Sequence, residues 1–206
     1  MKLKVLIATV AILMFNNAYA ESASTLQNAI KGEIYTAQSQ PELYCLAMNI
    51  YHESKSEPLA GQYAVADVTI NRTLDTRYPN TVCEVVMQAR MKESWKTKQY
   101  PDLPDSERKY VPIRNKCQFS WYCDGRRDIV QLQYRQAPRK GRVIEANMRD
   151  WRRSVETAIQ VMDGWSRDVS GGATHYYNHN ISTPSWSTVY PTTTVIENHT
   201  FLVRND

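Results

Sequence analysis

The glutamate at position 53 is the residue of this chain best placed for acid–base chemistry. Apolar residues at three- and four-residue spacing, Leu43, Leu46 and Ile50, predict a helix that begins near Pro41 and ends near Glu53. A carboxyl at that end of an apolar helix loses water through packing and faces the negative end of the helix dipole, and both effects raise its pKa. A carboxyl that stays protonated near neutral pH can give a proton to a glycosidic oxygen. Glu53 is therefore a candidate general acid, although glutamates are common near helix ends and the spacing alone is a weak signal.

Two other carboxylates could take part in such a reaction. Glu57 lies four residues after Glu53 and precedes Pro58, and its alternative role is to stabilise the loop by accepting backbone hydrogen bonds. Asp124 is the nearest candidate for a second acid, but Asp124-Gly125 is typical of a turn. We expect Glu53 to carry the chemistry and Glu57 to line the site.

The histidines do not have the spacing of a metal site. His175 and His179 are four residues apart, but two glycines and several asparagines make their segment a poor helix. His52-Glu53 does not begin an HExxH motif, because position 56 is Ser56. We therefore expect neither a metal nor a cofactor.

Four cysteines, Cys45, Cys83, Cys117 and Cys123, follow a predicted export signal. An even number of cysteines in that context indicates two disulfides, and the absence of a CxxC motif disfavours zinc. Four cysteines permit three pairings, which the sequence alone does not separate. The pairing that we favour is Cys45–Cys83 with Cys117–Cys123.

A series of short motifs runs in order over residues 42–203. They comprise Tyr51, Glu53, Glu57, Pro58, Gly61, Gln62, Ala64, Val65, Ala66, Asn71 and Arg72, then Pro79–Cys83 with Val85 and Val86, Gln118–Tyr122, Gly172–Asn178, Pro184 with Trp186, and Asn198, His199 and Phe201. Together these motifs resemble the SleB/CwlJ-type cell-wall hydrolases. The chain departs from that pattern at Ser54-Lys55-Ser56, where alanine-arginine-glycine is usual, and at Glu197, where glycine is usual. Glu53-Ser54 also resembles the glutamate-serine pair of lysozyme-like lytic transglycosylases.

The resemblance implies a lysozyme-like fold and cleavage of the MurNAc–GlcNAc β-1,4 bond of peptidoglycan. In a lytic transglycosylase one carboxyl, here Glu53, protonates the leaving oxygen and then acts as base on the 6-hydroxyl of the sugar, which closes to a 1,6-anhydro product. Ordinary glycosidases need two carboxylates, and no second acid is obvious in the matched motifs. A muramidase that releases reducing ends remains the alternative outcome.

Two segments could hold the sugar. Gln118, Ser120 and Tyr122 alternate, so they would share one face of a strand, whereas the alternative is a disulfide-flanked turn with its aromatic residues in the core. His175 and Tyr177 would also share a face, with Tyr176 opposite, and the alternative for this segment is simple packing. We expect these six residues, with Glu57, to bind substrate.

Two other classes of function are compatible with the sequence. A zinc-dependent N-acetylmuramoyl-L-alanine amidase would cut the bond between glycan and peptide, but potential zinc ligands are few. A non-catalytic peptidoglycan-binding protein would not need Glu53.

The elements that must position these residues are mainly helical. Helices are predicted at 42–53, 59–74, 81–88 and 145–165, and β-leaning segments lie at 174–177 and 200–203. Residues 91–115 are charged and interrupted by prolines, which predicts a surface insertion that is longer than the resemblance leads us to expect. The expected fold class is mainly α with a few short strands (α+β).

The N-terminal residues have the order of a secretory signal. Lys2 and Lys4 precede an apolar stretch of about 11 residues, short of the roughly 20 that span a bilayer, and Ala18-Tyr19-Ala20 completes a cleavage site. We predict a signal peptide at 1–20, a flexible leader at 21–40 and a catalytic domain at 41–206, with export to the periplasm or the medium and no stable membrane insertion after cleavage. Without the two signal lysines the net charge falls from +4 to +2, which does not favour nucleic acid as a partner. The expected partner is the peptidoglycan glycan strand.

Overall fold

The computed structural model describes residues 37–126, 128 and 141–205. The predicted signal peptide and most of the predicted leader lie outside these residues, so both stay predictions. Within the described ranges, no helix is long and apolar enough to cross a membrane.

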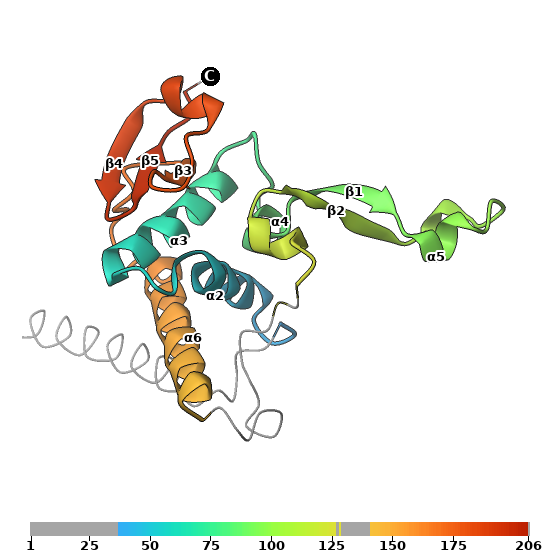
Figure 1. The fold of residues 1–206 in the computed structure, drawn as a ribbon, viewed down its shortest axis with the longest axis horizontal. Coiled ribbons are helices and arrows are strands. Elements are labelled where there is room, and N and C mark those ends of the chain that lie inside the picture. The colour runs from blue at the N-terminus through green and yellow to red at the C-terminus, as the bar shows by residue number, and fades with distance from the viewer. Residues whose placement is uncertain (1–36, 127, 129–140, 206) are drawn as a thin grey trace, which may run out of the picture.

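Helix α2 (Pro41–Ser54) is the centre of the fold (Figure 1). All residues from Cys45 to Tyr51 are buried, as expected of a helix that other elements surround. It packs against three further helices, α3 (Leu59–Leu74), α4 (Val82–Val86) and α6 (Gly141–Met162). The four predicted helices are therefore confirmed, with α3 at its predicted bounds.

A three-stranded antiparallel sheet covers one side of α3. Its strands are β3 (His175–Asn178), β4 (Thr192–Ile196) and β5 (His199–Leu202), in the order β3-β5-β4. The central strand β5 is buried throughout, and Phe201 packs with Val65 and Val68 of α3. This contact fixes the sheet, and therefore the residues of β3, relative to the helices.

The turn between β4 and β5 shows why glycine is usual at position 197, where this chain has a glutamate. Ile196 pairs with His199, so Glu197 and Asn198 alone form the turn. Glu197 has a φ of 48°, in the left-handed region that favours glycine. The glycine that is usual at this position suits that backbone conformation.

Residues 89–117 form a two-stranded arm that extends away from the helices (Figure 1). Strands β1 (Ala89–Glu93) and β2 (Tyr110–Cys117) pair antiparallel, with α5 (Trp95–Lys98) and the short 3-10 helix η1 (Asp105–Glu107) toward its tip. The sequence predicted a surface insertion at 91–115 but not its paired strands. Most residues of both strands are exposed, so they lack the alternation of apolar and polar residues by which a strand is predicted.

Both disulfides have the pairing that we favoured. Cys45–Cys83 joins α2 to α4, and Cys117–Cys123 joins the end of β2 to the 3-10 helix η2 (Ser120–Cys123). The first bridge ties the central helix to its neighbour. The second closes a short loop at the base of the arm.

Candidate active site

An open cavity of about 500 Å³ lies where the end of α2 meets the sheet and the segment after β2. Glu53 and Glu57 line it from the end of α2 and the following loop, and Arg72 lines it from α3. Gln118 and Ser120 line it from the side of the arm. The remaining lining residues come from 3-10 turns, loops and strands of the C-terminal part: Tyr176, Tyr177, Asn178, Ile181, Ser182, Pro184, Trp186 and His199, together with Phe119.

Glu53 is held by a tyrosine from the sheet. The Tyr176 hydroxyl donates a hydrogen bond to Glu53 Oε2 at 3.0 Å. Burial raises the pKa of the Glu53 carboxyl, while the Tyr176 hydrogen bond and the positive charge of Arg72 oppose that rise. The structure thus places at this position a carboxyl that is both desolvated and oriented, as a general acid requires.

Arg72 is a buried cation beside the Glu53 carboxyl. Its Nε donates to the backbone oxygen of Thr174 at 2.7 Å, and its guanidinium lies 5.2 Å from the ring centroid of Phe119. Nη1 is buried without a hydrogen-bond partner in the described structure. The charge of Arg72 favours the ionised form of Glu53, so it can stabilise the carboxylate that remains after proton transfer.

Glu57 lies in the same cavity, near a histidine of β5. Glu57 Oε1 is 3.9 Å from Nδ1 of His199, and burial lowers the pKa of His199 while the charge of Glu57 opposes this. The Gln62 side chain donates to the backbone oxygen of Glu57 at 3.1 Å, which anchors the loop to α3. His199 is buried, and it also lines the cavity.

The Gln118–Tyr122 segment is a turn and not a strand. It ends in the 3-10 helix η2, with Phe119 and Trp121 buried in the core, so Gln118 and Ser120 face the cavity but Tyr122 packs against the core cluster. The expectation that all three polar residues share a face was therefore wrong for Tyr122. A strand would have kept the alternation, whereas the tighter winding of a 3-10 helix turns the third side chain away.

A buried hydrogen-bond chain fixes this turn against the helices. Trp121 Nε1 donates to Asn49 Oδ1 at 3.0 Å, and Asn49 Nδ2 donates to Thr69 Oγ1 at 3.1 Å. The ring of His52 stacks on Trp121 at 4.6 Å, and burial lowers the pKa of His52 to about 4. His52 is therefore neutral at neutral pH and serves as a packing surface.

Only two of the three predicted binding residues on strand β3 line the cavity. Tyr176 and Tyr177 both line the cavity, whereas His175 packs against Trp186 and Tyr190, with ring centroids 5.2 and 4.8 Å away. His175 is thus not among the lining residues, and its expected role in substrate binding stays a prediction.

Sequence reasoning gave no role to Arg72 or to the loop from Asn178 to Pro184, although both belong to this site. A charged residue within an apolar helix was the available signal for Arg72, because arginine is seldom buried without a partner. Asp124 accepts a hydrogen bond from the backbone of Arg126 at 2.7 Å, as expected of a turn. Within residues 37–126, 128 and 141–205, no three His, Cys, Asp or Glu side chains gather as a possible metal site.

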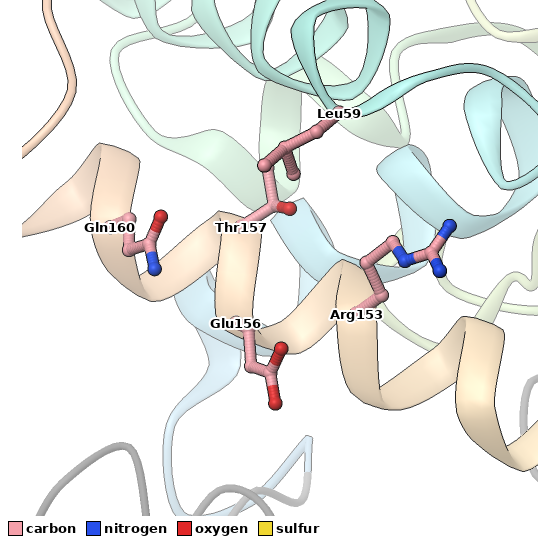
Figure 2. A pocket seen from close by; sticks show the side chains of 5 residues that line it. All are labelled: Leu59, Arg153, Glu156, Thr157 and Gln160. Carbon is pink, nitrogen blue, oxygen red and sulfur yellow. The ribbon is translucent and has the colours of Figure 1, made fainter. Parts of the chain in front are cut away.

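A separate cavity of about 340 Å³ lies between the start of α3 and α6 (Figure 2). It is lined by Leu59, Arg153, Glu156, Thr157 and Gln160, none of which lines the cavity of Glu53. It contains none of the residues that the sequence predicted for the site.

Comparison with known proteins gives consistent matches. The sequence model of a family described as Cell Wall Hydrolase matches residues 56–202, so Glu53 lies three residues before the matched region. Spore cortex-lytic enzymes of Bacillus cereus and Oceanobacillus iheyensis are each 24% identical over 163 residues, which is 79% of this chain and 44% and 42% of theirs. The chain therefore spans less than half the length of these curated relatives.

Two solved structures are similar at the same level of identity. The catalytic domain of the germination-specific lytic transglycosylase SleB from Bacillus anthracis is 24% identical, with a TM-score of 0.45, over 82% of this chain and 98% of that one. The catalytic domain of the Bacillus cereus SleB protein is 24% identical, with a TM-score of 0.47, over 80% of this chain and 91% of that one.

Proposed function

Because the chain belongs to the cell wall hydrolase family, we propose that it cleaves peptidoglycan glycan strands at the MurNAc–GlcNAc β-1,4 bond, with Glu53 as general acid and base. The observation that carries the proposal is the Glu53 carboxyl itself. It lines an open cavity of about 500 Å³, its pKa is raised by burial, and Tyr176 orients it. An open cavity of this kind suits a polymer that enters and leaves along its length.

The proposed reaction moves one proton out of Glu53 and one back. Protonated Glu53 gives its proton to the glycosidic oxygen, and the bonding electrons of the C1–O bond leave with that oxygen. Arg72 and the Tyr176 hydroxyl stabilise the resulting carboxylate. The 6-hydroxyl of the same MurNAc then attacks C1 while Glu53 removes its proton, which closes the 1,6-anhydro ring and restores the acid.

Hydrolysis is the competing outcome, and one observation favours it. Glu57 lines the same cavity, so a second carboxylate is near the substrate. In that reaction Glu57 would activate a water molecule and the product would carry a reducing end. We favour the transglycosylase outcome because it needs only one carboxyl, and Glu53 is the carboxyl that Tyr176 orients.

Mass spectrometry of digested peptidoglycan separates these possibilities. We expect 1,6-anhydro muropeptides, each lighter by one water than the hydrolytic product, from the wild-type protein and none from Glu53→Gln. Reducing-end sugars would contradict the transglycosylase mechanism and direct attention to Glu57. Release of free stem peptides, abolished by a chelator, would indicate an amidase instead. Binding without any cleavage would indicate a non-catalytic wall protein.

A further inference from the structure

A third cavity, of about 310 Å³, lies at the root of the arm. It is lined by Gln88, Ala89, Arg90, Lys116, Cys117 and Gln118. Gln118 also lines the cavity that contains Glu53. The two hollows therefore adjoin at one shared side chain.

The cavity lies beside an irregularity in strand pairing. Ala89 pairs with Cys117 but Met91 pairs with Pro112. The short step from Ala89 to Met91 along β1 is therefore matched by a longer step, from Cys117 to Pro112, along β2. Asn115, within the longer step, has a φ of 58°. Bulges of this kind re-aim side chains and occur often beside active sites, and here Arg90 and Lys116 end up lining one hollow.

The chemical character of the cavity is cationic, with one unsatisfied acceptor. Arg90 and Lys116 are exposed, no acidic residue lines the hollow, and neither cation has an ion pair among the described residues. Glu93, the acid on the same strand, is already paired with Arg108 at 2.7 Å. The Gln88 side-chain oxygen is buried without a hydrogen-bond partner in the described structure.

We propose that this cavity is a subsite for the acidic stem peptide of peptidoglycan, with Arg90 and Lys116 binding peptide carboxylates and Gln88 Oε1 accepting a peptide N–H. The inference rests on the proposed function, since the peptide reaches this hollow as a substituent of a glycan bound beside Glu53. A ligand that offers several carboxylates and peptide N–H donors matches two cations and one acceptor. A strand stripped of its peptides keeps only the lactyl carboxylate on each muramic acid and offers no peptide N–H. The protein should therefore prefer strands that still carry stem peptides.

Kinetics on two substrates test the subsite. The substrates are glycan strands with stem peptides and the same strands after enzymatic removal of the peptides. Exposed charge pairs are worth little individually, so we expect the KM of the wild-type protein to be about three- to tenfold lower on the peptide-bearing strands. Arg90→Gln/Lys116→Gln should raise that KM to the value for bare strands, leaving kcat and the cleavage of bare strands unchanged.

The matched control is Lys96→Gln/Lys98→Gln, which removes two exposed charges from α5 on the same arm, away from its root. It should keep the preference. Equal KM values for both substrates in the wild-type protein, or equal losses in both double variants, would overturn the subsite while leaving the proposed function intact.

A binding measurement keeps the two proposals distinguishable. Calorimetry with Glu53→Gln compares a disaccharide that carries its stem peptide with the same disaccharide without it. Tighter binding of the first that depends on Arg90 and Lys116 supports the subsite even if no glycan is cleaved, in which case the proposed function alone fails. Equal affinity for both disaccharides would refute the subsite.

Discussion

Replacing Glu53 by glutamine should abolish catalysis while leaving the fold intact. Glutamine keeps the shape of the side chain and an oxygen that can accept the hydrogen bond from Tyr176. It cannot transfer a proton. General acid–base catalysis contributes about 10²–10⁴-fold, and a group that acts as both acid and base should lie at or beyond the upper end, so we expect a rate loss of at least about 10⁴-fold.

The same substitution should leave the protein at least as stable as the wild type at neutral pH. Burial raises the pKa of Glu53 above its ordinary value of 4.5, so the folded protein binds this proton more tightly than the unfolded chain does. The free energy of unfolding therefore falls as pH rises from 4.5 through the raised pKa. Glutamine does not ionise, so Glu53→Gln should melt at or above the wild-type temperature at neutral pH, and the difference should vanish in acid.

The assay combines muropeptide release with thermal unfolding across the pH range. Glu57→Gln is the matched control, because it makes the same chemical change four residues away in the same cavity. It should lose less activity, acting through the loop. If Glu57→Gln is inactive while Glu53→Gln still works, the assignment of the catalytic glutamate is wrong. A marked fall in the melting temperature of Glu53→Gln at neutral pH would refute the view that its ionised form destabilises the fold.

Three further outcomes follow from the described structure and the sequence. Burial raises the pKa of Asp67 to about 7, and its carboxylate accepts a hydrogen bond from the Val169 backbone at 2.8 Å. The free energy of unfolding should therefore fall as pH rises from 3.8 to about 7. Asp67→Asn should remove that dependence in melting curves. Reduction of Cys45–Cys83, verified by thiol counting, should cost about 2–4 kcal/mol and lower the melting temperature, and an unchanged temperature would show that this bridge does not support the core. Intact-mass analysis of the exported protein should give a chain that begins at Glu21 and lacks four thiol hydrogens, whereas free thiols would contradict oxidation.

The helices could be predicted because their signals are local. In α3, small apolar residues recur at helical spacing between Pro58 and Asp75, and the helix occupies that interval. Strand β4 was missed although Thr192–Ile196 is a run of five β-branched residues, because threonines beside a proline also suit a loop. The strands of the arm gave no signal, since neither face is buried against a core.

The site was predictable where a residue's role depends on its own element. The place of Glu53 could be predicted from the end of its own helix. The places of Gln118 and Ser120 could be predicted from their positions on either side of Phe119. Tyr122 was assigned by assuming a strand, and the 3-10 turn places it elsewhere. The hydrogen bond from Tyr176 to Glu53 joins residues 123 positions apart, and no local pattern encodes such a distance.

The arm has a consequence for how this protein can evolve. Its two strands pair with each other and with no other strand of the described structure, so insertions or substitutions toward its tip leave the packing of α2, α3 and α6 untouched. Its root, in contrast, adjoins the wall of the cavity that contains Glu53, through Gln118. Natural variation can therefore lengthen, shorten or recharge this one appendage, and so change what lies beside the Glu53 cavity, without a compensating change in the core.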